Sequence, residues 1–265
     1  MIIEILLIII LFFLLKKLFI SINNEEEFNN KENAYITLVT NDLYVPGVLA
    51  LGNSMNKLNL KYKKICLYKN INDDSINKIK KEKFELISIE ELNNKNIKLN
   101  IKLDKYKYNI KRFKEAFNKL YIWSLIEYNK LVYLDCDMIV YKNIDNLFKK
   151  PTLSAVQGRP MFNSGLLVIK PSMKIFNDLN KLINDPNKWI KNKRDLLGKS
   201  INDQALLGYY FKDYNKLSRK YNVTKNYHSK IKDIYIKHWN LKEKPWFYSC
   251  KSEKSSKEWC KFYNY

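Results

Sequence analysis

Residues 130–148 read KLVYLDCDMIVYKNIDNLF, and this stretch decides how the rest of the chain is interpreted. An apolar run over 131–134 leads into Asp135 and Asp137, and a second apolar run over 138–141 follows. Short runs of β-branched and aromatic residues are typical of buried strands. Open α/β sheets bind ligands at the carboxyl ends of their strands, where buried carboxylates need a cation or donors opposite them. The stretch therefore predicts a divalent metal that bridges to phosphate oxygens; the alternative is a turn capped by Asp135, with Asp137 solvated.

The segments on either side of this stretch alternate between strand and helix patterns. Strands are expected at 33–40, 64–68, 84–89, 131–134, 154–157 and 165–169. Helices are expected from residue 46 to about 58 and at 74–82, 113–127, 172–184 and 202–211, with 113–127 clearly amphipathic. This alternation is typical of a mainly parallel sheet with helices on both faces. We therefore predict an α/β fold in one large domain.

The charge of the chain is strongly positive. Its 265 residues include 48 Lys and Arg against 27 Asp and Glu, a net charge of +21. Such an excess could indicate binding to nucleic acid or to an acidic membrane. However, the excess is mostly lysine scattered among asparagines and isoleucines, as an AT-rich coding sequence produces. Because no nucleic-acid-binding motif is present, we expect no nucleic-acid partner.

The amino-terminal segment is apolar. Residues 2–15 carry one charge, Glu4, and Lys16-Lys17 then precede three more apolar residues. A helix must reach about residue 22 to span a bilayer core about 30 Å thick. We expect a single-pass membrane anchor over 1–22, a linker over 23–32, the main domain over 33–250 and a tail over 251–265; a short buried core helix is the alternative to the anchor. The two lysines favour a cytosolic domain, with the luminal side left open.

The cysteines show no metal-ligand spacing. Cys250 and Cys260 could pair in an oxidising lumen, but we expect free thiols at both, as at Cys66 and Cys136. Residues 222–224 form a glycosylation sequon, which matters only if the domain is luminal.

Several segments of the chain together resemble glycosyltransferase family 8, and most closely its glycogenin branch. In chain order they are AYITLVTNDLY (34–44), NKL (118–120) with WSL (123–125), LDCD (134–137), NID (143–145), FNSG (162–165), DQ (203–204) and HWNLKEKPW (238–246). They cover about residues 33–246. The resemblance implies a single GT-A type, Rossmann-like nucleotide-sugar-binding domain. It also implies a UDP-sugar donor, manganese dependence, and transfer with retention of the anomeric configuration.

The resemblance also implies roles for individual residues. The metal ligands would be Asp135, Asp137 and His238, a mixed oxygen and nitrogen set that suits Mn²⁺ better than Mg²⁺. The residues implied to hold the donor are Leu38, Thr40, Asn41, Tyr44, Arg112, Lys119, Asp135, Cys136, Asp137, Asn163, Asp203, Gln204, His238, Leu241 and Lys244. Tyr44 would stack on the base, and Lys244 would contact the diphosphate as a point charge. The catalytic residues, which line the sugar and the reacting carbon, would be Lys119, Asn163, Asp203 and Gln204.

Each of these residues also has an ordinary structural interpretation. Residues 163–165 could form a simple turn, Asp203 could cap a helix, and Tyr44 could be a core aromatic residue. His238 would by default lie at the surface.

The chain also departs from the family pattern. Leu241 stands where the family has glycine, and Gln157 and Ser200 stand where the glycogenin branch has aspartates near the sugar. No tyrosine matches the one that glycogenin glucosylates on itself, so Tyr227 and Tyr235 are only candidates.

The prediction from sequence is a membrane-anchored, metal-dependent glycosyltransferase. It would move a hexose, with glucose as the first choice, from a UDP-sugar to a glycan, protein or lipid acceptor. A homodimer is allowed for. The alternative is a catalytically silent relative that binds nucleotide-sugar or glycan and serves as an assembly factor at a membrane.

Overall fold

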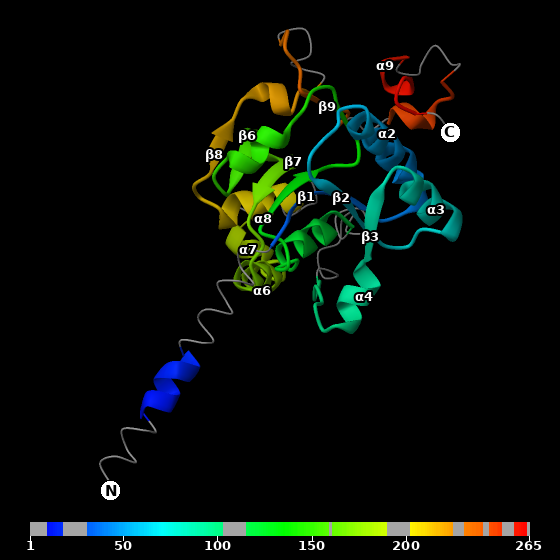
Figure 1. The fold of residues 1–265 in the computed structure, drawn as a ribbon. Helices are drawn as coiled ribbons and strands as arrows, with labels where there is room; N and C mark the ends of the chain where they lie inside the picture. The colour runs from blue at the N-terminus through cyan, green and yellow to red at the C-terminus, as the bar shows by residue number, and fades with distance from the viewer. Residues whose placement is uncertain are drawn as a thin grey trace, which may run out of the picture.

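The computed structural model describes residues 10–17, 31–102, 115–158, 161–189, 202–224, 231–240, 244–250 and 257–263. Its centre is a seven-stranded sheet with the order β3-β2-β1-β4-β7-β6-β8 (Figure 1). The strands are β1 (Asn33–Val39), β2 (Lys63–Tyr68), β3 (Phe84–Ser88), β4 (Lys130–Leu134), β6 (Ser154–Gln157), β7 (Phe162–Ile169) and β8 (Asn215–Leu217).

The strand directions agree with a mainly parallel sheet. β1 pairs in parallel with β2 and β4, and β2 pairs in parallel with β3. β7 runs antiparallel to both β4 and β6, while β6 and β8 are parallel. The predicted mainly parallel α/β sheet is therefore confirmed, and β7 is the strand of this sheet that runs the other way. A second, two-stranded sheet pairs β5 (Met138–Val140) with β9 (Ile236–His238) in antiparallel register.

Four helices begin where short polar side chains cap them, whereas α2 (Val45–Asn56) begins at a Val-Pro pair without a side-chain cap. Asn72, Ser88, Ser172 and Asn202 each accept a hydrogen bond from a backbone N–H in the first turn of the helix that follows. The α-helices are α2 (Val45–Asn56), α3 (Asp73–Lys81), α4 (Ile89–Asn94), α6 (Met173–Leu182), α7 (Pro186–Trp189), α8 (Asp203–Tyr210) and α9 (Lys257–Cys260). The 3₁₀-helices are η1 (Asp42–Tyr44), η2 (Asn118–Trp123), η3 (Asp145–Lys149), η5 (Arg219–Tyr221) and η7 (Pro245–Phe247).

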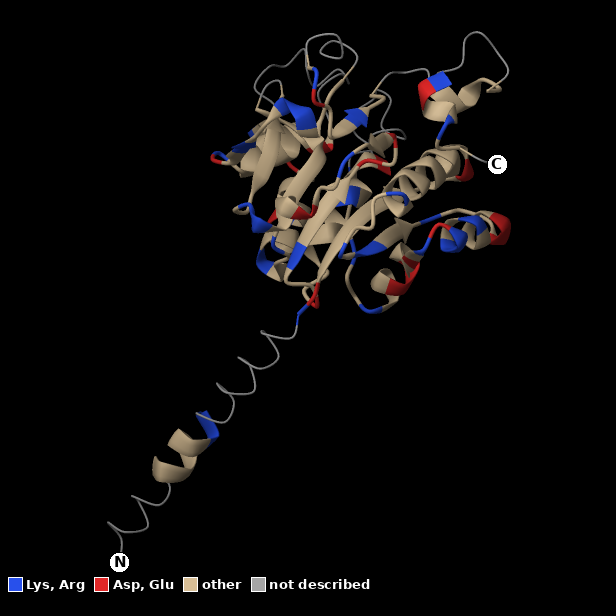
Figure 2. Cartoon of the chain, turned by 45° about the horizontal axis from the view of Figure 1, so that its top comes forward, with Lys and Arg blue, Asp and Glu red and all other residues tan. Residues whose placement is uncertain are grey.

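The two faces of the sheet carry separate hydrophobic clusters, because side chains alternate along a strand. On β4, Leu131 and Tyr133 pack on the face covered by η2, α6 and α8. Val132 and Leu134 pack on the opposite face, which α2 covers (Figure 1). Charged residues of the described chain are spread over many elements rather than gathered on one (Figure 2).

The amphipathic helix predicted over 113–127 is wrong for the described residues. Residues 115–117 are helical, 118–123 form the 3₁₀-helix η2, and the chain turns away after Ser124. Every residue of η2 is buried, Lys119 included. An amphipathic helix buries one face and exposes the other, whereas this segment is enclosed on all sides. The spacing of its apolar residues was therefore not a sign of a half-exposed helix.

β7 begins three residues earlier than the strand predicted at 165–169, so residues 163–165 do not form a simple turn. They belong to the strand because β7 pairs on both sides: Leu166 lies opposite Leu134 of β4, and Asn163 lies opposite Val156 of β6.

The predicted membrane anchor, and the localisation that rested on it, are overturned. Within the part of the chain that the structure describes, no helix has both the length and the apolar character needed to cross a bilayer. Of the predicted anchor, only residues 10–17 are described; they are helical. The predicted linker lies outside the described residues, apart from positions 31 and 32.

The expectation of free thiols is wrong for two of the four cysteines. Cys250 and Cys260 form a disulfide with their Cα atoms 5.8 Å apart, whereas Cys66 and Cys136 are free. Trp259 is buried next to this bridge, and its ring stacks on Tyr263. The folded chain places the two cysteines within bonding distance, which their spacing in the sequence did not reveal.

Candidate active site

The carboxylates of the central stretch lie on a tight turn between β4 and β5. The Asp135 N–H donates to the Gly165 carbonyl at 2.8 Å, and the Met138 N–H donates to the Asp135 carbonyl at 3.2 Å. The Asp135 side chain is 27% exposed and the Asp137 side chain 10%. The turn therefore directs both carboxylates toward the edge of the sheet where β4 ends, as the sequence predicted.

His238 reaches this turn through the small sheet. It lies opposite Met138 in the β5–β9 pairing, and the Trp239 N–H donates to the Asp137 carbonyl at 2.9 Å. His238 Nε2 lies 3.1 Å from Asp137 Oδ1 and 3.8 Å from Asp135 Oδ2. One ligand atom from each of the three residues falls within 4.8 Å of the others. The structure thus brings the three predicted metal ligands together.

These residues fit a divalent cation. Asp137 Oδ1 is buried and accepts no hydrogen bond, although His238 Nε2 faces it. The other oxygen, Oδ2, accepts a hydrogen bond from the buried Lys244 ammonium. Burial alone would raise the pKa of Asp137, but His238 and Lys244 outweigh it and hold this pKa well below its usual range. An ionised carboxylate with an unpaired buried oxygen beside an imidazole is a suitable ligand set for a divalent metal ion.

A second cation, Lys119, lies fully inside the protein next to the turn. Its Nζ atom lies 3.1 Å from Asp135 Oδ1 and 2.7 Å from Asp203 Oδ2. Burial alone would lower the pKa of Lys119, but the two carboxylates outweigh it and raise this pKa. Ser164 joins the cluster, because its hydroxyl donates to Asp203 Oδ2 at 2.7 Å. Three of the predicted site residues are therefore linked in one buried ionic network.

A cavity of about 340 Å³ opens beside these groups. The predicted donor residues that line it are Leu38, Thr40, Asn41, Tyr44, Lys119, Asp135, Cys136, Asp137 and Asp203. Asn163, Gln204, His238 and Lys244 are not part of its lining; Gln204 accepts a hydrogen bond from the Ser164 N–H at 3.2 Å. Arg112 and Leu241 lie outside the described residues, as does Ser200, whereas Gln157 is exposed at the end of β6.

Four further residues that were not predicted from the sequence line the cavity: Val39, Glu115, Ala116 and Tyr133. Tyr133 is the most informative, because its hydroxyl donates to Asp135 Oδ1 at 2.7 Å. Its position two residues before Asp135 on a strand, and hence on the same face, could have indicated this contact. Glu115 and Ala116 precede Lys119 by one helical turn, a spacing that also signals proximity.

The carboxyl-terminal segment packs against Tyr44, which lines the cavity. The Trp246 indole N–H donates to the Leu43 carbonyl at 2.8 Å, and its ring meets Tyr44 edge-on at 5.8 Å between centroids. Tyr44 therefore lies between the cavity and an aromatic wall, with its orientation restricted by that contact.

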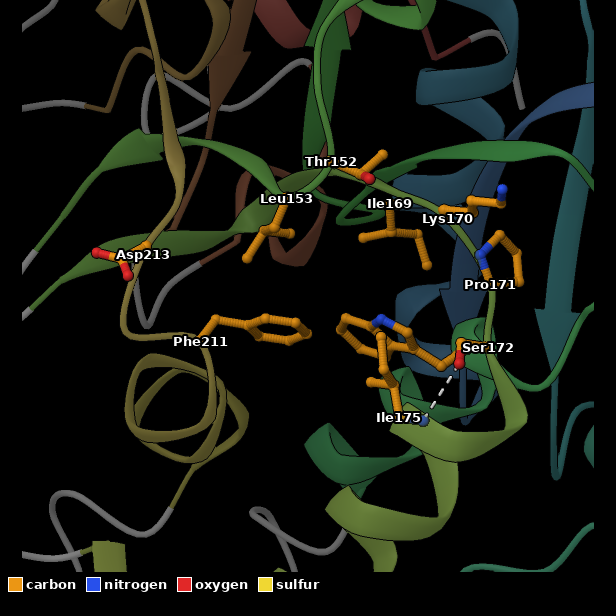
Figure 3. Close-up of a pocket in the computed structure, with 10 residues that line it drawn as sticks. Thr152, Leu153, Ile169, Lys170, Pro171, Ser172, Ile175, Phe211 and Asp213 are labelled. Atoms are coloured by element: carbon orange, nitrogen blue, oxygen red, sulfur yellow. Dashed lines mark hydrogen bonds between the residues drawn. The ribbon is translucent and has the colours of Figure 1, made fainter.

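A larger cavity, of about 540 Å³, lies elsewhere (Figure 3). Trp123 and Phe211 form part of its wall, with ring centroids 5.8 Å apart and planes inclined by 24°. Ile169, another lining residue, ends β7, whereas Gly165 near the start of that strand contacts the metal-ligand turn. No predicted site residue lines this cavity. The smaller cavity is therefore the candidate site, because the carboxylates and Lys119 line it, although the other cavity is larger.

Gly165 is needed for the approach of the metal ligands. A Cβ atom at this position would lie 2.6 Å from His238 Cε1 and 2.9 Å from Asp135 Oδ2. Gly165→Ala should therefore push the ligands apart and weaken Mn²⁺ binding by about 10-fold, since overpacking costs on the order of 1–3 kcal/mol. Isothermal titration with MnCl₂ measures the change.

Gly208→Ala is the matched control for this substitution. A Cβ atom on Gly208 in α8 would meet only Met161, at 3.4 Å, and alanine favours a helix over glycine. Manganese affinity should be unchanged in this variant. Equal manganese affinity in both variants would show that Gly165 does not shape a metal site.

Comparison with known proteins agrees with this geometry. The family model described as glycosyl transferase family 8 matches residues 35–156. Glycogenin-1 of Mus musculus is 31% identical over 183 residues, which cover 68% of this chain and 51% of the relative. Uncharacterized protein R707 of Acanthamoeba polyphaga mimivirus is 28% identical over 245 residues, with coverage of 80% and 82%. The putative UDP-glucuronate:xylan alpha-glucuronosyltransferase 5 of Arabidopsis thaliana is 32% identical over 203 residues, with coverage of 75% and 32%.

The fold also matches solved glycosyltransferase structures. The apo-form glycosyltransferase GlyE of Streptococcus pneumoniae TIGR4 superposes with a TM-score of 0.63 at 20% identity, over 89% of this chain and 61% of that one. The galactosyltransferase LgtC, solved with donor and acceptor sugar analogs, gives a TM-score of 0.61 at 15% identity, over 86% and 94%. At these identities the likeness concerns the fold.

The chain spans about half the length of the mouse glycogenin and about a third of the Arabidopsis enzyme. The matched family segment nevertheless runs from β1 to β6 and includes both carboxylates of the turn. With its glycosyltransferase fold and its identity to glycogenin, the chain belongs to glycosyl transferase family 8 and is glycogenin-like within it.

Proposed function

We propose that the protein is a metal-dependent, retaining glycosyltransferase that moves a hexose from a UDP-sugar to an acceptor. The observation that carries the proposal is the gathering of Asp135, Asp137 and His238 within 4.8 Å, with both carboxylates lining a 340 Å³ cavity. In this reaction the nucleoside diphosphate is the leaving group and departs as a polyanion. The site therefore needs positive charge in place before the bond between sugar and diphosphate breaks. Retention is implied by the family resemblance.

In this proposal Asp135, Asp137 and His238 hold a divalent cation, Mn²⁺ rather than Mg²⁺ because imidazole is one ligand. When bound, the cation supplies charge stabilisation to the departing diphosphate. Lys244 adds a second positive charge near the diphosphate, since its ammonium pairs with the metal ligand Asp137.

The protein residues around the cavity would place the two ends of the donor. Asn41 Oδ1 is buried without a hydrogen-bond partner and can accept from the N–H of a uracil ring, next to the restricted ring of Tyr44. At the other end, Lys119 and Ser164 orient Asp203 by bonds of 2.7 Å each. We propose that Asp203, with Gln204 and Asn163, faces the sugar and the reacting carbon.

Two donor sugars are candidates, glucose and glucuronate. Glucose is the first choice by resemblance to glycogenin, while the printed name of the Arabidopsis relative specifies UDP-glucuronate as donor and xylan as acceptor. Gln157 is exposed, so it offers a neutral amide where the glycogenin branch has an aspartate. Glucose and glucuronate donors therefore need to be compared directly. The homodimer allowed for above has no support in the described chain.

The decisive experiment incubates the full chain with UDP-glucose, UDP-galactose, UDP-glucuronate or UDP-xylose, with and without Mn²⁺, and measures released UDP. We expect release with UDP-glucose that a chelator abolishes. Mass spectrometry of the same samples should show no hexose ladder, because no tyrosine matches the self-glucosylated one. If the protein binds UDP but releases it from no donor, it is the catalytically silent relative instead.

Lys244→Ala should weaken the binding of UDP and UDP-sugar by about 10-fold or more, since hydrogen bonds to charged groups are worth about 1.5–3 kcal/mol. Binding of Mn²⁺ alone should not weaken, because the variant removes a cation that competes for Asp137 Oδ2. Titration calorimetry separates the two effects.

Lys142→Ala is the matched control for the Lys244 variant. Lys142 also pairs with an aspartate, Asp233, but both side chains are about half exposed. UDP binding should be unaffected in this variant. An unchanged UDP affinity in Lys244→Ala would remove Lys244 from the diphosphate site.

A further inference from the structure

Asn222 lies between His238 and Asn163 and has no role in the reaction proposed above. It follows η5, is 5% exposed, and is held beside β9 because the neighbouring Val223 bridges to Lys237. Asn222 Oδ1 lies 2.9 Å from His238 Nδ1, and Asn222 Nδ2 lies 2.8 Å from Asn163 Oδ1. The amide therefore connects a metal ligand to a residue of the sugar site.

The directions of these hydrogen bonds follow from one backbone group. The Gly165 N–H lies 2.9 Å from the side-chain amide of Asn163 and can only donate, so the atom that it meets is the oxygen Oδ1. The Asn222 atom that faces the same oxygen must then be its donor, Nδ2. The remaining atom of the Asn222 amide is the acceptor Oδ1, and it faces His238 Nδ1. His238 must therefore carry a proton on Nδ1.

A proton on Nδ1 determines what the other ring nitrogen offers. Which nitrogen of an imidazole binds a metal is set by the hydrogen bond that the other nitrogen makes. His238 Nε2 faces Asp137 Oδ1 at 3.1 Å and Asp135 Oδ2 at 3.8 Å, so positive charge has to lie between the ring and these oxygens. Nε2 is thus the atom that is directed at the metal position.

We propose that Asn222 is a positioning residue that keeps the proton of His238 on Nδ1 and so presents Nε2 to the metal. This inference rests on the metal site of the proposed function. Asn222 touches neither carboxylate in this role; it acts through the histidine ring, as an outer partner that orients a ligand.

The same chain of bonds reaches the sugar site. Asn163 Oδ1 already accepts from Gly165 and from Asn222, so the amide nitrogen is the polar atom of Asn163 that can serve a sugar hydroxyl. A shift of Asn222 would therefore disturb the metal ligand and the sugar contact together.

The folded site also has no room for a glycan on Asn222, although residues 222–224 form a sequon. The Asn222 side chain is buried, and its Nδ2 atom donates to Asn163.

Nuclear magnetic resonance tests the proton position directly in the full chain labelled with ¹⁵N-histidine. The chain has two histidines, and His228→Gln identifies the signal of the other. The wild-type protein should show a protonated, exchange-protected Nδ1 on His238 without metal and with diamagnetic Mg²⁺. Asn222→Ala should lose this protected signal, and electron paramagnetic resonance should show a Kd for Mn²⁺ raised about 10- to 100-fold.

Two further variants complete the test. Asn222→Asp keeps an acceptor for Nδ1, while it replaces the donor to Asn163 by an oxygen and adds a negative charge beside the ring. It should therefore retain the protected signal and recover most of the Mn²⁺ affinity. It also serves if the alanine variant does not fold. Asn56→Ala, which removes a partly buried amide bonded to Glu82, should change neither readout.

The outcomes separate this inference from the proposed function. An unprotonated Nδ1 in the wild-type protein, or wild-type signal and affinity in Asn222→Ala, would overturn the role of Asn222. If the wild-type protein binds no Mn²⁺, the metal site of the proposed function is wrong. The Nδ1 signal of the metal-free protein then still decides whether Asn222 holds the proton.

Discussion

Asp137→Asn is expected to lower glycosyl transfer by a factor of hundreds or more and to leave the protein folded. The substitution keeps the shape of the side chain and removes the charge that a cation needs, and such electrostatic groups are worth on the order of 3–4 kcal/mol in the transition state. Folding should survive because asparagine retains an oxygen for Lys244, which also donates to the Trp239 carbonyl at 2.9 Å. UDP release at saturating Mn²⁺ and the thermal midpoint measure the two effects.

Asp178→Asn is the matched control. Asp178 likewise accepts hydrogen bonds from a lysine and another side chain, Lys174 and Tyr210, but on the surface of α6. The transfer activity of the Asp178→Asn variant should equal that of the wild-type protein. If Asp137→Asn instead unfolds the domain, or if the wild type is fully active in chelator, the two carboxylates of the turn are structural and the metal mechanism fails.

Lys119→Met is expected to have the largest combined effect on stability and activity. The Lys119 side chain is 6% exposed and its ammonium pairs with Asp135 and Asp203, so its removal leaves two neighbouring carboxylates without their shared cation. Breaking a buried pair in this way costs about 3–5 kcal/mol in the free energy of unfolding. Transfer should fall by at least about 100-fold, because Asp203 loses the bond that orients it.

The effect of Lys119→Met should not depend on pH in the usual assay range. The pKa of Lys119 is raised above its ordinary value, so its contribution to stability is complete below about pH 10 and is lost only at higher pH. Urea unfolding at pH 7 and pH 9 should therefore give the same deficit. A deficit that vanished at pH 9 would mean that Lys119 is not held by its two carboxylates.

Lys64→Met provides the control for a buried lysine outside the site. Lys64 is 8% exposed and donates to the Glu82 carbonyl at 2.6 Å, and burial lowers its pKa to about 8. Because burial already disfavours the charged form of Lys64, replacing it by methionine should lower the free energy of unfolding only slightly. Glycosyl transfer should be unchanged. Similar losses of stability in both variants would assign the Lys119 effect to packing rather than to charge.

The turn with Asp135 and Asp137 could be predicted from the sequence because its determinants are local. Two apolar runs on either side of the carboxylates specify two strands, and each strand places its side chains by its own backbone geometry. The same holds for the helix starts at Ser172 and Asn202, where the capping side chain is within three residues of the N–H that it accepts from.

Other features could not be read locally because partners distant in the chain decide them. His238 joins the carboxylates through its pairing with Met138, and only the family resemblance pointed to it in the sequence. Residues 118–123 have an apolar spacing that predicts an amphipathic helix, yet tertiary contacts enclose them and bury Lys119 against Asp135 and Asp203.

Asn222 shows most clearly what the tertiary structure decided. In the sequence it begins a glycosylation sequon, a pattern of exposed loops. In the folded chain it is buried, because His238 and Asn163 satisfy both ends of its amide. The sequence by itself determined most strands of the large sheet, the helix starts at Ser172 and Asn202 and the two carboxylates of the turn, since these depend on neighbouring residues; it did not indicate β8 or β9. The tertiary structure decided which distant side chains meet those carboxylates, because burying a polar group costs free energy unless the fold brings a partner of opposite charge or hydrogen-bonding character to it.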